Sequence, residues 1–219
     1  MLDYHPVTIA IGDTFRELVQ ITGDEFERLN GIRPQVITDE DVKGIDYGVP
    51  HFIKAWLWDL VPKNVDRVLF LDADVLPVKP IDSIMDVPFA AVMDIGKKWR
   101  MHGIRILVHR DIYVNTGVFI ATRETQEVFD KLKLFAASTA DAWSNIYEQT
   151  ILNILLQEKI GITVLPDAWN WQMYYNQRKG IEHAKFLHFF GAGFPVASNF
   201  QPLHAIAQLN RLYACPPNC

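Results

Sequence analysis

The chain has 219 residues, of which 49% are hydrophobic and 21% are charged, so it is long enough for one globular domain with a full core. Its net charge of −5 argues against a general nucleic-acid-binding protein, which needs a basic face to neutralise phosphates. No apolar run reaches the roughly 18 residues of an integral membrane segment, and the N-terminus lacks the basic-then-apolar order of a signal peptide. We therefore expect a single domain over residues 1–219 that resides in the cytoplasm.

Strands and helices are expected to alternate along the chain. Apolar or β-branched runs predict strands at 7–11, 35–38, 68–71, 89–93, 117–121, 162–165 and 185–188. Helices are predicted at 14–23 (where Thr14 and Glu17 suggest a capping box), 51–59, 123–136, 144–157 and 202–212. This alternation predicts an α/β fold in which a mostly parallel sheet is covered by helices on both faces. The polar stretch 96–111, with five Lys and Arg, is either a functional loop or a solvated face.

Ligands of open α/β sheets bind beyond the carboxyl ends of the strands, so polar residues at those ends are candidate site residues. Asp72 and Asp74 follow the apolar run 68–71, and two carboxylates one residue apart can place oxygens on one Mg²⁺ or Mn²⁺. His188 ends the last predicted strand and can add an imidazole nitrogen, which favours manganese. The glycine-rich turn that follows it offers backbone N–H groups to phosphate oxygens.

In their order along the chain, these motifs resemble the retaining glycosyltransferases of family 8. The resemblance extends over residues 8–195. The matching segments are Ile9–Phe15, Lys54, Asp72–Asp74, Asp94, Asn115–Gly117, Glu148–Gln149 with Asn153, Leu165–Asn170 and His188–Pro195. It implies a GT-A fold, a Rossmann-like nucleotide-binding arrangement within one domain.

The resemblance also implies an activity and assigns residues to it. The enzyme is expected to be a hexosyltransferase that moves a sugar with retention from a UDP-sugar, such as UDP-glucose or UDP-galactose, to a glycan or other hydroxyl acceptor. Metal binding, of Mn²⁺ or Mg²⁺, is assigned to Asp72, Asp74 and His188. Catalysis is assigned to Asp94, Glu148 and Gln149. Donor binding is assigned to Ala10, Ile11, Asp13, Phe15, Lys54, Asp72, Ala73, Asn115 and Gly191.

Two residues depart from the family pattern. Phe194 stands where the family has a Lys that contacts the donor phosphates, and Phe cannot neutralise a phosphate. Either another cation substitutes, from the 97–110 stretch or from Arg178 and Lys179, or donor binding is weaker. Phe194 also motivates an alternative function, a catalytically inactive nucleotide-sugar binder. Glu148 stands where an Asp is usual, which moves the carboxylate by about one carbon–carbon bond.

Two further alternatives concern local motifs. The sequence Asp72-Ala73-Asp74-Val75 also fits a haloacid-dehalogenase-like phosphatase, although that class carries the motif on its first strand. Four aromatic residues can either stack on an acceptor sugar or belong to the core. They are Trp169, Trp171, Tyr174 and Tyr175.

Overall fold

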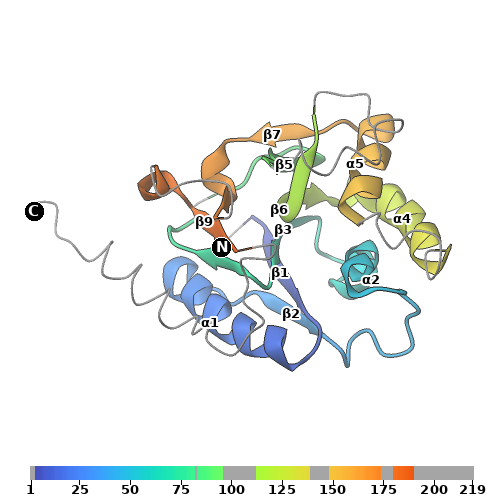
Figure 1. Cartoon of the computed structure of the whole chain (residues 1–219), viewed down its shortest axis with the longest axis horizontal. Coiled ribbons are helices and arrows are strands. Elements are labelled where there is room, and N and C mark those ends of the chain that lie inside the picture. The colour runs from blue at the N-terminus through green and yellow to red at the C-terminus, as the bar shows by residue number, and fades with distance from the viewer. Residues whose placement is uncertain (1–2, 82, 96–111, 139–147, 174–179, 190–219) are drawn as a thin grey trace, which may run out of the picture.

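The computed structural model describes residues 3–81, 83–95, 112–138, 148–173 and 180–189. These residues form a central six-stranded sheet with helices on both faces and a separate three-stranded sheet (Figure 1). The predicted helix at 202–212 and the polar stretch 96–111 lie outside the described residues. The assignment of residues 1–219 to one domain stays a prediction.

The large sheet has the strand order β2-β1-β3-β6-β5-β7. Its strands are β1 (His5–Ala10), β2 (Gln35–Thr38), β3 (Arg67–Asp72), β5 (Phe89–Met93), β6 (Val114–Thr122) and β7 (Thr163–Leu165). The pairs β1–β2, β1–β3 and β5–β7 are parallel, whereas β6 runs antiparallel to both of its neighbours. The predicted α/β class with a mostly parallel sheet is confirmed, and β6 is its antiparallel member.

The helices follow the predicted order, with different boundaries. They are α1 (Asp13–Asn30), η1 (Pro50–Trp56), α2 (Leu57–Leu60), η2 (Arg123–Thr125), α4 (Gln126–Ser138), α5 (Glu148–Lys159), η3 (Asp167–Trp169) and η4 (Ile181–His183). Among the described residues, no helix combines the length and apolar character needed to cross a membrane.

The start of α1 differs from its prediction. The capping box of Thr14 and Glu17 is wrong, because Gly12 is the N-cap residue and no side chain caps the helix. Gly12 has a φ of 84°, a conformation that favours glycine, and its N–H donates to Asp39 Oδ2 at 3.0 Å. The helix also extends seven residues beyond Gly23, the expected end, to Asn30.

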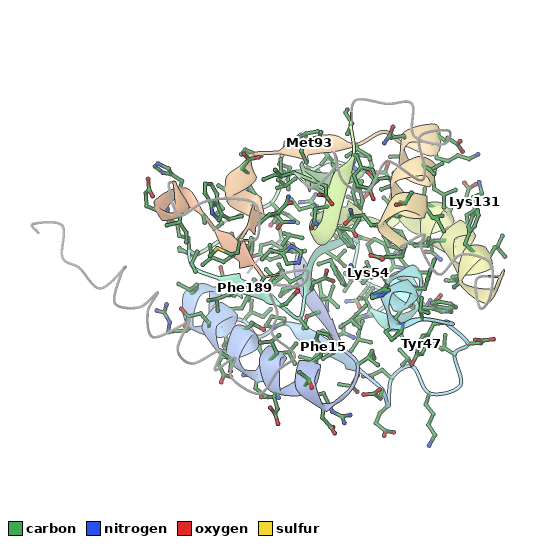
Figure 2. All side chains as sticks on the ribbon, in the orientation of Figure 1. Phe15, Tyr47, Lys54, Met93, Lys131 and Phe189 are labelled. Atoms are coloured by element: carbon green, nitrogen blue, oxygen red, sulfur yellow. The ribbon has the colours of Figure 1, made fainter. Side chains whose placement is uncertain are left out.

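Alternate residues of the central strands pack on opposite faces of the sheet. Phe70 of β3 stacks on Phe119 of β6, with ring centroids 4.6 Å apart, in the core that includes α2, α4 and α5. Leu69 and Leu71 belong to the second core with Phe26 of α1. Because both faces are covered, β3 is apolar and buried from Val68 to Leu71, and its partly exposed side chains, Arg67 and Asp72, lie at its two ends. Figure 2 shows Lys54 at the centre of the molecule and Lys131 at its periphery.

The small sheet was not predicted from the sequence. It consists of β4 (Val75–Pro77), β9 (Phe186–His188) and β8 (Trp171–Gln172), with β9 in the middle. β4 is antiparallel to β9, and Val75 lies opposite His188. Since β4 begins just after Asp74, this pairing brings the late strand β9 to the end of β3.

Candidate active site

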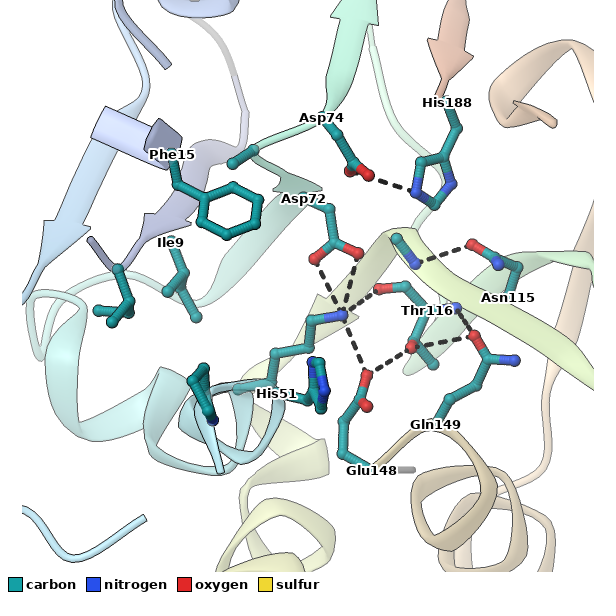
Figure 3. A pocket seen from close by; sticks show the side chains of 15 residues that line it. Ile9, Phe15, His51, Asp72, Asp74, Asn115, Thr116, Glu148, Gln149 and His188 are labelled. Atoms are coloured by element: carbon teal, nitrogen blue, oxygen red, sulfur yellow. Dashed lines mark hydrogen bonds and ion pairs between the residues drawn. The ribbon is translucent and has the colours of Figure 1, made fainter. Parts of the chain in front are cut away.

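A cavity of about 470 Å³ lies where the carboxyl ends of β1 and β3 meet η1, β6, α5 and β9 (Figure 3). One end is lined by the apolar residues Ile9, Ile11, Phe15 and Pro50. We call this the apolar end. The opposite, polar end is lined by carboxylate, amide, hydroxyl, ammonium and imidazole groups from β3, β6, α5, η1 and β9. The cavity therefore offers an apolar surface next to a highly charged one.

The predicted metal ligands come together at the polar end. One ligand atom each from Asp72, Asp74 and His188 lie within 4.8 Å of one another. His188 Nε2 is 3.3 Å from Asp74 Oδ1, and the imidazole is buried. Two carboxylates and one imidazole fit Mn²⁺ or Mg²⁺, which take further oxygen ligands from substrate or water.

Burial and neighbouring charges act in opposite directions on the two aspartates. Burial raises the pKa of Asp72, the charge of Lys54 opposes this, and that of Asp74 adds to it, so the pKa lies above its ordinary value. Burial also raises the pKa of Asp74, but His188 and, after it, the charge of Lys54 and a backbone hydrogen bond act against burial, and the pKa is lowered. Asp72 keeps 29% of its side chain exposed, so it remains accessible to a ligand in the cavity.

Lys54 of η1 connects three elements beneath the cavity. Its Nζ lies 2.9 Å from Asp72 Oδ1 and donates to Glu148 Oε1 at 3.1 Å and to the carbonyl of Thr116 at 3.3 Å. Burial by itself lowers the pKa of Lys54, but the charges of Asp72 and Glu148 raise it above its ordinary value. Burial raises the pKa of Glu148, but Lys54 and, after it, His51 act against burial, and the pKa is lowered. The ammonium is therefore charged and held between two carboxylates.

Side chains of α5 hold the start of β6, where the pairing with β3 has ended. The last β3–β6 pair is Leu71 with Val118. Before it, Asn153 accepts from the N–H of Val114 at 2.8 Å and donates to its carbonyl at 2.9 Å. These bonds satisfy buried backbone groups that have no partner from β3. They also dock the first turns of α5 against the cavity.

Glu148 and Gln149, at the start of α5, are fixed by their own bonds. Glu148 accepts from Thr116 Oγ1 at 3.1 Å, and Gln149 Oε1 accepts from the N–H of Thr116 at 3.1 Å. Gln149 Nε2 donates to Asp94 Oδ2 at 2.6 Å. Thr116 therefore contacts Lys54, Glu148 and Gln149 with three different atoms.

The structure places most, but not all, predicted site residues on the cavity. Those that line it are Ile11, Phe15, Lys54, Asp72, Ala73, Asp74, Asn115, Glu148, Gln149 and His188. Asp94 is buried and reaches the site through Gln149, while Ala10 is buried in the core. Asp13 is exposed and pairs with Arg16. Gly191, Phe194, the 97–110 stretch, Arg178 and Lys179 lie outside the described residues.

Five lining residues had no individual role in the sequence-based prediction. Pro50 and His51 were assigned no role, while Ile9, Thr116 and Gly117 were quoted only as parts of matching segments. His51 lies three residues before Lys54, so the helical periodicity of this segment places it on the same face. Thr116, like Lys54, bonds to three other residues of the polar end.

The aromatic residues predicted for an acceptor site do not line the cavity where they are described. Trp169 packs on Phe186, with ring centroids 6.2 Å apart, and Trp171 packs on the small cluster around Leu187. This agrees with the alternative that they belong to the core. Tyr174 and Tyr175 lie outside the described residues.

Several solved glycosyltransferase structures are similar to the chain. The galactosyltransferase LgtC, in complex with donor and acceptor sugar analogues, has a TM-score of 0.62 at 16% identity, covering 86% of this chain and 87% of that one. Mouse xyloside xylosyltransferase 1 gives 0.53 at 11% identity, covering 88% and 99%. A glycosyltransferase involved in glycosylation of the major capsid of PBCV-1 gives 0.57 at 15% identity, covering 94% and 99%. These likenesses show that the chain has the GT-A fold.

The family is shown by sequence rather than by structural likeness. Among curated proteins, none matches the chain. The family model described as glycosyl transferase family 8, however, matches residues 27–195, which is more than half of the chain. This match confirms the expected class of glycosyl-transferring enzyme and leaves the phosphatase alternative without support. The chain belongs to glycosyltransferase family 8.

Proposed function

We propose that the protein transfers a hexose from a UDP-sugar to a hydroxyl acceptor, with retention of configuration and in dependence on Mn²⁺ or Mg²⁺. The observation that carries this proposal is the charge of the cavity. Among the described residues that line it, Lys54 is the only Lys or Arg, against the three carboxylates of Asp72, Asp74 and Glu148. With the histidines neutral, one ammonium and three carboxylates give a net charge of −2.

A cavity of net charge −2 repels a diphosphate unless a cation is added. The ligand atoms of Asp72, Asp74 and His188 provide the place for that cation. A divalent cation held by these residues supplies Lewis-acid stabilisation of the diphosphate leaving group. Phe194 in place of the family Lys increases the dependence on this charge, because Lys54 is already balanced by Asp72 and Glu148.

The two ends of the cavity support an orientation for the donor. Phe15 presents an exposed ring beside Ile9, Ile11 and Pro50, a surface suited to stacking a uracil base. The metal ligands lie beyond it, where a diphosphate follows the nucleoside. Asn115, Glu148 and Gln149 at the far wall offer hydrogen-bonding groups to sugar hydroxyls.

Retention is proposed to occur by attack on the face of the sugar from which the diphosphate leaves. The bond between the anomeric carbon and the phosphate oxygen breaks, the bond to the acceptor oxygen forms, and the acceptor proton passes to the departing phosphate. A covalent alternative needs a nucleophile, but Gln149 Oε1 accepts from Thr116 N–H and Glu148 Oε1 accepts from Lys54 and Thr116. These bonds suit the two residues to orient the sugar. Mass-spectrometric trapping of a glycosyl-enzyme on Glu148 would exclude front-face attack.

The test is a screen of nucleotide sugars, with and without Mn²⁺, for a rise in thermal unfolding temperature and for release of UDP. A ligand that binds the native state raises its apparent stability. We expect UDP-glucose or UDP-galactose to stabilise the protein only with metal, and UDP to be released when an acceptor is supplied.

Other outcomes identify the alternatives. Metal-dependent binding without release, whichever acceptor is supplied, indicates the inactive nucleotide-sugar binder. Hydrolysis of phosphomonoesters without any response to nucleotide sugars indicates the phosphatase. Stabilisation by UDP-sugars in EDTA contradicts the proposed role of the cavity charge.

A further inference from the structure

The imidazole of His188 contacts Asn170, a residue to which the proposed chemistry gives no part. His188 Nδ1 lies 3.0 Å from Asn170 Oδ1, and Asn170 Nδ2 lies 2.9 Å from Asn115 Oδ1. We propose that Asn170 is a positioning residue which, oriented by Asn115, fixes the tautomer of His188 so that Nε2 is kept for the metal. This inference rests on the proposed metal site and adds a residue that keeps His188 in the tautomer able to bind the metal.

The orientation of the two amides follows from one backbone group. The N–H of Gly117 donates to Asn115 Oδ1 at 2.9 Å, and a backbone N–H can only donate. The Asn115 atom at that point must therefore be the oxygen. The Asn170 atom that meets the same oxygen must be the NH₂ group, so its own oxygen faces His188. Since that oxygen only accepts, His188 Nδ1 must carry a hydrogen.

The hydrogen bonds that lead from Gly117 through Asn115 and Asn170 to His188 form a relay. The relay has a function because a competing tautomer of His188 exists. Asp74 Oδ1 lies 3.3 Å from His188 Nε2 and would by itself favour a hydrogen on that nitrogen. A neutral imidazole with hydrogen on Nε2 has no lone pair there for a metal. It would also place the Nδ1 lone pair against the oxygen of Asn170. Asn170 is fully buried, so water cannot easily relieve that contact.

Gly117 fixes the imidazole in space as well as in the relay. A Cβ added to Gly117 would lie 2.0 Å from Cε1 of His188, closer than any real contact. The ring therefore lies directly on the backbone of β6. The same residue that accommodates the ring also donates the N–H that orients Asn115, so position and tautomer depend on one segment.

The test measures the tautomer in the metal-free protein, independently of activity. Imidazole ¹⁵N chemical shifts and two-bond couplings distinguish hydrogen on Nδ1 from hydrogen on Nε2. We would record them at about pH 8, where an ordinary histidine is neutral. The His188 signals are assigned among the seven histidines by their loss in His188→Gln. Mn²⁺ affinity of each variant is then measured by electron paramagnetic resonance.

Two substitutions at position 170 separate the relay from simple packing. Asn170→Ala removes the acceptor, so we expect the Nε2–H form to increase and Mn²⁺ affinity to fall by roughly 10- to 100-fold, as for other groups that orient metal ligands. Asn170→Asp keeps an acceptor at Nδ1, so we expect it to retain the Nδ1–H form.

Gln172→Ala is the matched control. Gln172 is equally buried, lies opposite His188 in the β8–β9 pair, and bonds instead to Ile95 N–H and the Met93 carbonyl. We expect it to leave the tautomer unchanged. The relay is overturned if Asn170→Ala keeps the wild-type tautomer, or if Gln172→Ala changes it as much. If wild-type protein binds no Mn²⁺, the proposed function fails, while the metal-free spectra still decide the relay.

Discussion

The two ends of the cavity are built on different principles. At the polar end, buried or half-buried side chains of Lys54, Asp72, Thr116, Glu148 and Gln149 bond to one another. At the apolar end, Phe15 is 46% exposed and its ring lies open to the cavity. The polar end is held in shape before any substrate arrives, while the apolar end provides contact area.

This difference predicts where the protein tolerates change. A buried group that loses its partner costs the full penalty of its desolvation, whereas an exposed ring can be altered with little effect on folding. Substitutions at the polar end should therefore affect both stability and catalysis. Those at the apolar end should affect donor affinity alone.

The largest effect is expected from Lys54→Met. The substitution keeps much of the side-chain volume but leaves Asp72 and Glu148 facing each other without their cation. Breaking a buried ion pair by removing one partner costs about 3–5 kcal/mol, and we expect a loss of that order in the free energy of unfolding. Chemical denaturation measures it, with Lys131→Met, which breaks an exposed pair with Glu127, as the control expected to change stability little.

The pH dependence of the stability difference between wild type and Lys54→Met tests whether that difference is electrostatic. The pKa of Glu148 is lowered from its ordinary 4.5, so its contribution is present above pH 4.5 and lost as the pH falls through the lowered value. The pKa of Lys54 is raised from its ordinary 10.5, so its contribution is present below pH 10.5 and lost as the pH rises through the raised value. The stability difference between wild type and Lys54→Met should shrink at pH values below the lowered pKa of Glu148 or above the raised pKa of Lys54. If it does not shrink there, the difference comes from packing instead.

The next largest effect is expected from Asp74→Ala. Loss of one ligand weakens metal binding and removes stabilisation of the leaving group, so we expect UDP release to fall about 10²- to 10³-fold. Mn²⁺ titration followed by electron paramagnetic resonance should show the weakened site, and circular dichroism an intact fold. Asp46→Ala, in an exposed loop, is the control. Full activity in Asp74→Ala would show that the metal site is assigned to the wrong residues.

A smaller effect is expected from Thr116→Val, which removes the hydroxyl bonded to Glu148 and preserves the backbone contacts to Lys54 and Gln149. A hydrogen bond to a charged group contributes about 1.5–3 kcal/mol, which bounds the expected loss of transition-state stabilisation. The kinetic constants kcat and KM measure it. Thr150→Val removes another buried hydroxyl, which bonds to Tyr113 instead, and equal losses in both variants would argue against a specific role for Thr116.

The smallest effect is expected at the apolar end. Phe15→Ala should weaken donor binding by about 0.5–1.5 kcal/mol, the range of aromatic pair interactions, and leave kcat and thermal stability nearly unchanged. Phe15→Tyr keeps the stacking surface and should bind the donor like wild type. Calorimetric titration with UDP compares the three proteins. A large loss of stability in Phe15→Ala would remove the contrast between the two ends.

Much of the polar end was predictable because its residues follow strong local signals. The apolar run before Asp72 predicts a buried strand, and the end of such a strand is where side chains become available to ligands. The motifs around Asn115, Gln149 and His188 were assigned to the same site through the family resemblance. The class of fold followed from the same apolar runs.

The relations between these residues were not predictable in the same way. The strands β4 and β8 carry too little periodicity to be recognised, whereas the equally short β7 and β9 were predicted from the runs 162–165 and 185–188. The antiparallel direction of β6 could not be predicted, because a strand that is buried on both faces has the same apolar sequence in either direction. Hydrogen bonds such as that between Asp94 and Gln149 depend on tertiary positions that no spacing encodes.

The pairing of β4 with β9 has a consequence for biosynthesis. Asp74 leaves the ribosome early, but its partner His188 arrives only with one of the last described strands, so a nascent chain lacks the complete ligand set until β9 has paired. Because a metal that binds only the assembled set stabilises the folded state, acquisition of the metal then marks completion of the domain rather than nucleating it.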